Sequence, residues 1–162
     1  MKLKFTLVLF SLLFCTYLSH SQNLDGGNQH TIILTSDSSV WTIGKNEYGE
    51  LGDHTFERKI YPVRVNGLPK IIAVSRGYKH SIAVDIHHRV WTWGWNNYGQ
   101  LAASLPSDYQ FPQQVKDLDE VVAVEGGHWH TLALKKDGTV WSWGHNFYGE
   151  LGNGNREHSS QP

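Results

Sequence analysis

Short apolar segments alternate with polar turns along most of the chain. Residues 80–84 and 90–93 are rich in β-branched and aromatic side chains, and such segments favour strands. Alternation along the second segment places Trp91 and Trp93 on the same face of its strand. In the next unit the corresponding segments are separated by a turn at 136–139 that contains Asp-Gly, a strong hairpin signal. Beyond the first 21 residues no stretch has a helical period, so the pattern predicts an all-β fold.

Each unit contains two further predicted strands, which follow a Gly-x-Asn-x-Tyr-Gly loop. One begins at a proline, at 62–65 and again at 112–115, and proline is tolerated at the first residue of an outer strand. The other is a short apolar segment, at 71–74 and 121–124. Four short strands joined by tight turns are typical of a β-propeller blade.

The whole pattern recurs with a period of fifty residues, which indicates a repeat fold. The copies are 27–76, 77–126 and an incomplete third copy, 127–162. The residues that recur in register are Trp41, Trp91 and Trp141; Gly27, Gly77 and Gly127; His30, His80 and His130; Asn46, Asn96 and Asn146; Tyr48, Tyr98 and Tyr148; Leu51, Leu101 and Leu151.

Two motifs of the third copy identify the repeat. Gly-Gly-x-x-His-Thr-x-Ala-Leu at 126–134 precedes Gly-x-Val-Trp-x-Trp-Gly-x-Asn-x-Tyr-Gly-Glu-Leu-Gly at 138–152. Together they resemble the regulator of chromosome condensation repeat, and the resemblance covers nearly the whole chain after residue 21. It implies a β-propeller with one blade for each repeat, usually of seven blades. The second copy departs from this pattern at Arg76 and Ala102, where glycine is expected.

We therefore expect a partial β-propeller of four-stranded blades. About ten strands are predicted, or roughly two and a half blades, whereas propellers close with four to eight blades. Three explanations are open for a chain with too few blades to close. It is the N-terminal part of a longer protein, a truncated gene product, or a protomer that completes a ring with copies of itself. An open arc exposes strand edges and apolar faces, so self-association is also expected.

The first 21 residues have the layout of a secretory signal peptide. A short basic segment precedes an apolar run at 5–18, and small residues stand just before Gln22. This predicts a signal peptide at 1–21, a mature chain of 22–162 and a secreted or cell-surface location, with no membrane span. Lipidation at Cys15 is the alternative to cleavage.

Composition excludes some classes of function. The chain has 15 acidic against 14 basic residues, and removal of the signal peptide would take away two lysines. A mildly acidic chain lacks the basic surface that nucleic-acid binding requires. The single cysteine lies inside the signal peptide, so the mature chain would have neither a disulfide nor a thiol nucleophile.

Ten histidines invite a metal-binding interpretation, with His128 and His130 on one strand. However, His30, His80 and His130 recur at one repeat position, which favours a structural role such as a hydrogen bond between blades. No cysteine or carboxylate stands at a ligand spacing nearby, so we expect no metal site.

No catalytic constellation is predicted either. The chain lacks the Gly-x-Ser-x-Gly motif of serine hydrolases and any phosphate-binding loop, so we expect neither an enzyme nor a cofactor. Glu50 and Glu150 recur, but Gln100 replaces them in the second copy. That exchange favours a hydrogen-bonding role in the loop over catalysis.

The tryptophans fall into two groups. Those at repeat positions are predicted to be blade core: Trp41, Trp91, Trp93, Trp141 and Trp143. Trp95 and Trp129 stand at positions that vary between copies, so the fold does not require them. Aromatic residues dominate binding hot spots. The candidate binding surface is therefore Tyr78, Lys79, Trp95, His128, Trp129, His145 and Phe147. The alternative for this set is ordinary loop packing between neighbouring blades.

The leading functional hypothesis is a secreted, non-enzymatic module that binds a protein through propeller loops. The resemblance implies the same, because members of the family serve as binding platforms, including a secreted propeller that inhibits β-lactamases. A first alternative is guanine nucleotide exchange on a small GTPase, the activity of the founding member, which the signal peptide disfavours. A second alternative is a structural unit that assembles with itself.

Overall fold

The computed structural model describes residues 24–26, 29–103 and 107–162. The predicted signal peptide, its cleavage site and Cys15 lie outside these residues. Within the described ranges all regular structure is strand, and no helix there has the length and apolarity to cross a membrane.

Eleven strands form three antiparallel sheets. They are β1 (Leu24–Gly26), β2 (His30–Leu34), β3 (Val40–Gly44), β4 (Lys59–Arg64), β5 (Ile71–Arg76), β6 (His80–Asp85), β7 (Val90–Gly94), β8 (Tyr109–Gln114), β9 (Val121–Gly126), β10 (His130–Lys135) and β11 (Val140–Gly144).

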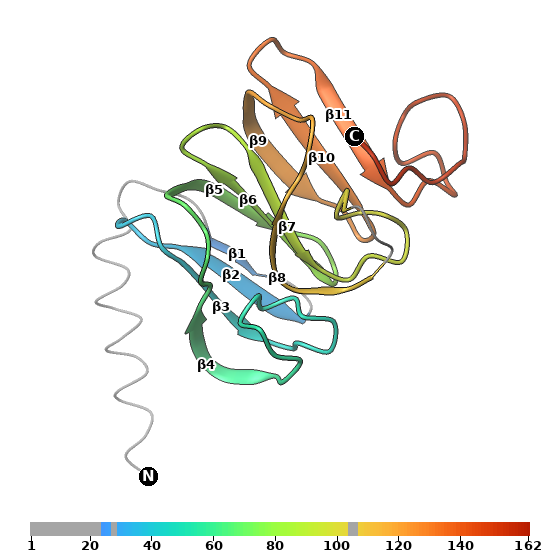
Figure 1. The fold of residues 1–162 in the computed structure, drawn as a ribbon. Helices are drawn as coiled ribbons and strands as arrows, with labels where there is room; N and C mark the ends of the chain where they lie inside the picture. Colours follow the sequence, from blue (N-terminus) through green and yellow to red (C-terminus); the bar gives the residue numbers. More distant parts are fainter. Residues whose placement is uncertain (1–23, 27–28, 104–106) are drawn as a thin grey trace, which may run out of the picture.

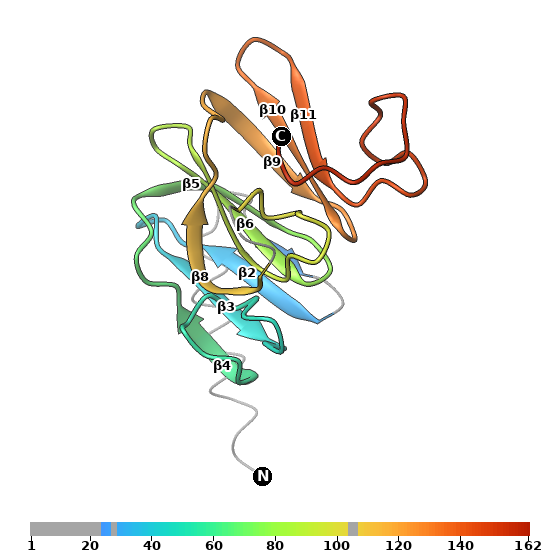
Figure 2. The same ribbon diagram turned by 45° about the vertical axis from the view of Figure 1, so that its right-hand side comes forward.

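The sheets follow one another in space in chain order, β1 to β4, then β5 to β8, then β9 to β11 (Figure 1). The first strands of the three sheets, β1, β5 and β9, contact one another in turn, whereas β4 and β8 lie at outer edges (Figure 2). This arrangement is a fan of propeller blades. The prediction of an all-β partial propeller is confirmed.

The sequence period reappears in the strand pairing. His30 pairs with Gly44, His80 with Gly94, and His130 with Gly144. Ala102 takes φ +50°, close to the +67° of Gly52 and the +64° of Gly152. The missing glycine of the second copy therefore leaves the loop conformation unchanged.

Two details of the strands were predicted wrongly. The outer strands begin before the proline, so Pro62 is the fourth residue of β4 rather than the first. Proline is tolerated there because β4 is the edge of its sheet, and the position without an N–H can face outward. Strand β1 was missed, because three residues carry no alternation. Strand β5 pairs with β6, so the last strand of one sequence copy is the first strand of the next blade.

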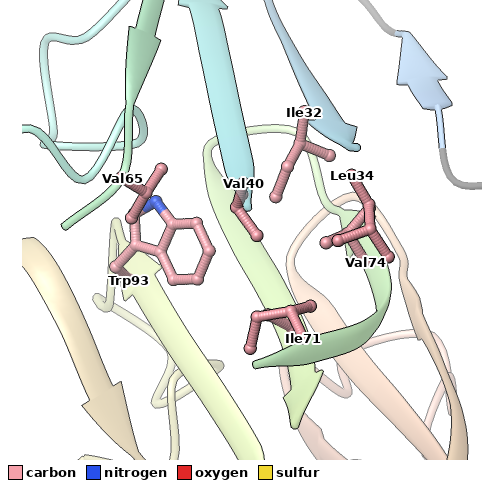
Figure 3. Packing of buried hydrophobic residues seen from close by; sticks show 8 residues of the cluster. Ile32, Leu34, Val40, Val65, Ile71, Val74 and Trp93 are labelled. Carbon is pink, nitrogen blue, oxygen red and sulfur yellow. The ribbon is translucent and has the colours of Figure 1, made fainter. Parts of the chain in front are cut away.

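The hydrophobic core lies between the blades. Residues of the first blade, such as Leu34 and Val65, pack against Ile71, Val74 and Trp93 of the second (Figure 3). A second cluster joins the other face of the middle blade to the third blade, and includes Ile82, Val84, Val115, Val121 and Trp143. All six residues of β6 are buried, because its sheet is covered on both faces.

The prediction for the tryptophans was only half right. Trp93 and Trp143 are fully buried, but Trp91 is only half-buried and Trp141 is 37% exposed. The Trp91 indole N–H donates to Oδ2 of Asp85 at 3.1 Å, where β6 ends at the hairpin turn. Trp41 and Trp141 are also tied to turn residues by their indole N–H groups. These three recurrent tryptophans brace hairpin turns, and they are not central core residues.

Candidate functional site: an aromatic band on one edge of the blades

All seven residues of the predicted binding surface lie at the same end of the blades. In each antiparallel sheet, the loop before a strand such as β6 and the loop after its partner β7 share one edge. Tyr78 and Lys79 lie just before β6, and Trp95 follows β7. The equivalent loops of the third blade carry the remaining members, His128, Trp129, His145 and Phe147.

The rings of these loops form a continuous series of contacts across two blades. Tyr78 stacks on His128, with ring centroids 4.1 Å apart and planes 11° from parallel. His128 lies edge-on to Trp129 at 4.6 Å. Trp129 contacts Trp95 at 6.1 Å and His145 at 5.3 Å. Residues that are far apart in the sequence thus come together in one cluster of rings.

Three tyrosines at repeat positions extend this series. Tyr98 lies 5.4 Å from Trp95 and 5.6 Å from Trp129. Tyr48 contacts Trp95 at 5.9 Å, and Tyr148 contacts Phe147 at 5.0 Å. We call the seven predicted residues together with these three tyrosines the aromatic band.

Reasoning from the sequence missed these tyrosines because it kept only positions that vary between copies. The signal that could have found them is their place in the same loop, three residues after Trp95 in the case of Tyr98. A residue that the repeat requires for its loop can still present one face of its ring to solvent.

Lys79 is the only lysine of the aromatic band. Its ammonium nitrogen lies 4.2 Å from the centroid of the Tyr48 ring, 5.2 Å from that of Trp95 and 5.6 Å from that of Tyr78. It also donates to Tyr48 Oη at 3.1 Å. Cation–π attraction to several rings fixes the position of this charge.

Exposure within the aromatic band is graded. Phe147 is 59% exposed and Tyr148 is 80% exposed, whereas His145 is buried. Tyr78, Trp95 and the other rings are half-buried or, like His128, exposed. The loop-packing interpretation is therefore right for the inner sides of these rings, and their outer sides form a surface.

Recurring polar side chains hold the loops that carry the tyrosines. The Tyr48 N–H donates to Glu50 Oε2 at 2.7 Å, and the Tyr98 N–H donates to Gln100 Oε1 at 3.0 Å. Glu150 makes the same bond to the Tyr148 N–H, at 2.8 Å. The predicted hydrogen-bonding role of this repeat position is confirmed.

Two carboxyl groups, those of Glu150 and Asp108, border the aromatic band. His145 Nδ1 lies 2.6 Å from Glu150 Oε1. Burial favours the neutral acid, but hydrogen bonds from backbone N–H groups and His145 outweigh it and lower the pKa of Glu150. Burial raises the pKa of Asp108, whose carboxylate accepts from the Asn96 N–H at 3.0 Å.

Two of the three recurring histidines join neighbouring blades. His30 Nε2 is 2.9 Å from Ser81 Oγ, and His80 Nε2 is 3.0 Å from Thr131 Oγ1. The predicted hydrogen bond between blades is confirmed at both positions. Among the described residues, no three or more His, Cys, Asp or Glu side chains group in a way that could hold a metal ion.

Comparison with known families agrees with this geometry. The family model for the regulator of chromosome condensation (RCC1) repeat matches residues 37–84 and 87–134. A second model with the same description matches 23–50, 71–100 and 121–150. The chain belongs to the regulator of chromosome condensation repeat family. No curated protein sequence matches it.

Solved structures show the same fold. Human WBSCR16 is 22% identical with a TM-score of 0.72, over 84% of this chain and 37% of that chain. Prp20p from Saccharomyces cerevisiae, described with its binding to Gsp1p and histones, is 19% identical with a TM-score of 0.75, over 88% of this chain and 37% of that one. Yeast RCC1 (Prp20) with bound Kap60 is also similar, with a TM-score of 0.72 and 19% identity, over 88% of this chain and 36% of that one. The chain thus spans less than two fifths of these proteins, and the likeness concerns the fold.

Proposed function

We propose that the chain is an exported, non-enzymatic protein-binding module, and that its partner lies against the aromatic band. The proposal rests on the way residues from separate loops lie together. Seven residues that the repeat does not require come from separate loops and lie together on one edge of the blades.

The chemistry of the aromatic band suits a protein partner. Tryptophan and tyrosine bury large areas and lose little conformational entropy on binding, which is why they are enriched in binding hot spots. The similar yeast protein Prp20p is described as binding Gsp1p and histones and has been solved with Kap60. That likeness supports a protein partner for this chain and does not identify it.

The aromatic band is also prepared for binding. Its rings contact one another, and Glu50, Gln100 and Glu150 hold the adjoining loop backbone. Side chains that are ordered before association lose less entropy in the complex. A rigid aromatic surface therefore supports specific recognition.

The test compares the full chain with Trp95→Ser and Phe147→Ser. Proteins captured by the immobilised full chain are identified and purified, and their dissociation constants are then measured by calorimetry. We expect at least tenfold weaker binding for each variant, as for a hot-spot residue. Ile86→Ser is the matched control, because Ile86 is 51% exposed in the turn at the opposite end of β6. Equal loss in the control, or no loss in the two variants, contradicts the proposal.

Export is part of the proposal and rests on the layout of residues 1–21. N-terminal sequencing and mass measurement of the protein recovered from the producing cells test it. We expect the chain to begin at Gln22. Retention of Met1 contradicts export, whereas a lipid on Cys15 contradicts cleavage before Gln22 only.

A further inference from the structure

We propose that Lys79 binds a carboxylate of the partner. An aromatic or aliphatic side chain of the partner, next to that carboxylate, then packs on the neighbouring rings. This inference rests on the proposed function, and it specifies the chemistry of the surface that would dock. The site comprises Lys79 with Tyr48, Tyr78 and Trp95, at the junction of the first two blades.

The position of the ammonium group is fixed without the use of its full hydrogen-bonding capacity. Lys79 Nζ lies 4.2 Å from the centroid of the Tyr48 ring and donates one hydrogen bond, to Tyr48 Oη. An ammonium carries three N–H donors. The rings therefore hold the charge in place, and donors are left for a ligand.

The charge of Lys79 is not paired with an acid among the residues that the structure describes. Lys79 forms no ion pair with the described residues, whereas Lys45 pairs with Glu47 at 2.9 Å in the adjoining loop. Asp108 interacts with Lys79 electrostatically but forms no ion pair with it, and its carboxylate accepts from the Asn96 N–H at 3.0 Å. A positive charge held on an aromatic surface is complementary to an acidic group of a partner.

Two phenol groups supply further donors beside Lys79. Tyr78 Oη accepts a hydrogen bond from Gln29 Nε2 at 2.7 Å, so its own proton is free to be donated. Tyr48 Oη accepts from Lys79 Nζ in the same way. A carboxylate has several acceptor sites, so it can take an ammonium and a phenol donor together.

The site occurs once among the three repeats. The positions equivalent to Lys79 are Gln29 and Trp129, neither of which carries a charge. The flanking rings of Trp95 and Tyr78 would cover an apolar side chain next to the carboxylate. Exclusion of water by that contact strengthens the ion pair, which would be weak if it were fully exposed.

The experiment uses two probe peptides that differ in one group, acetyl-Gly-Phe-Glu-Phe-Gly-amide and its glutamine counterpart. Each is titrated into the full chain, and the indole N–H resonances of Trp95 and Trp129 are followed by NMR. We expect saturable shifts with the glutamate peptide and roughly tenfold weaker binding of the glutamine peptide, because a hydrogen bond to a charged group is lost.

Variants test whether the preference for the glutamate peptide depends on Lys79. Lys79→Met is expected to weaken binding of the glutamate peptide about tenfold and to leave the glutamine peptide unchanged, whereas Lys79→Arg restores the preference. Lys136→Met is the matched control, since Lys136 is an exposed lysine in the turn at the opposite edge of the third blade. Equal binding of both peptides, no binding of either, or an unchanged preference in Lys79→Met overturns the anchor. None of these results affects the capture test of the aromatic band, so failure of the anchor and failure of the proposed function are distinguishable.

Discussion

His30 Nε2 donates to Ser81 Oγ, which links the first blade to the second. The direction follows from the hydroxyl, because Ser81 Oγ donates its single proton to the Glu50 carbonyl oxygen at 2.8 Å. His80 and Thr131 repeat the arrangement between the second and third blades, with the Thr131 hydroxyl donating to the Gln100 carbonyl. Each histidine is therefore a neutral donor on Nε2, and Nδ1 has no partner.

This arrangement predicts a loss of stability in acid. Burial, with a contribution from the charge of Arg76, lowers the pKa of His30 to about 3, from a usual value of 6.5. Burial and nearby positive groups lower the pKa of His80 to about 3 as well. Between pH 3 and pH 6.5 the unfolded chain therefore binds more protons than the folded chain. Stability should be complete above about pH 6.5 and fall toward pH 3, by about 1.4 kcal/mol per pH unit for each histidine.

Urea unfolding at intervals from pH 7 to pH 4 measures this slope. His80→Gln should reduce the slope by the share of one histidine, while His87→Gln, a change of an exposed histidine, leaves it as it was. A flat profile in the unsubstituted chain would show that the buried imidazoles can take up protons without unfolding.

Recurrence in the sequence indicated which positions the fold requires, but not how each one is used. It correctly assigned the histidines to the blade junctions, because a polar group that recurs inside apolar segments needs a recurring partner. It wrongly placed Trp91 in the core with Trp93, because alternation puts both on the same strand face. Distance along the strand separates them, because Trp93 lies between the blades and Trp91 lies near the hairpin turn. Alternation alone carries no information about that distance.

The candidate surface could be predicted from positions that differ between the copies, and not from positions that recur. Trp95, Trp129 and Lys79 stand where the copies differ, and a fixed repeat geometry brings equivalent loops to one edge. Contacts between specific side chains, such as the stacking of Tyr78 on His128, depend on the angle between blades. No pattern along the sequence encodes that angle.

Trp93→Ala should destabilise the chain much more than Trp91→Ala. Trp93 is fully buried between the first two blades, and its indole N–H donates to the Glu50 carbonyl oxygen at 2.9 Å. Loss of a buried tryptophan costs about 3–5 kcal/mol, and the half-buried Trp91 should cost roughly half as much. Guanidinium unfolding of both variants gives the comparison, and equal losses would contradict the assignment of Trp91 to the turn.

Gly126→Ala should separate the second and third blades. A Cβ at Gly126 would lie 2.3 Å from the Arg76 carbonyl carbon and 2.3 Å from the Gly77 nitrogen, both backbone atoms of the neighbouring blade. Backbone cannot move aside as a side chain does, so we expect a loss of about 1–3 kcal/mol or more. Gly26→Ala is the matched control at the same repeat position, since its nearest neighbour would be Thr31 Oγ1 at 3.9 Å. Thermal unfolding of the two variants should differ by several degrees, and similar melting temperatures would show that the blades tolerate the added methyl group.

The lateral faces of the first and third blades should promote self-association. Ile60 on β4 is 72% exposed, and Val140 on β11 is 67% exposed. Exposed apolar side chains on strands favour contact with another surface, because burial gains about 25 cal/mol per Å². We expect the apparent mass of the full chain in light scattering to rise with concentration. Val140→Glu and Ile60→Glu should each shift this rise to higher concentration, while Ile86→Glu, in a turn away from both faces, should not. A constant monomer mass over the whole concentration range would show that these faces are stable in water.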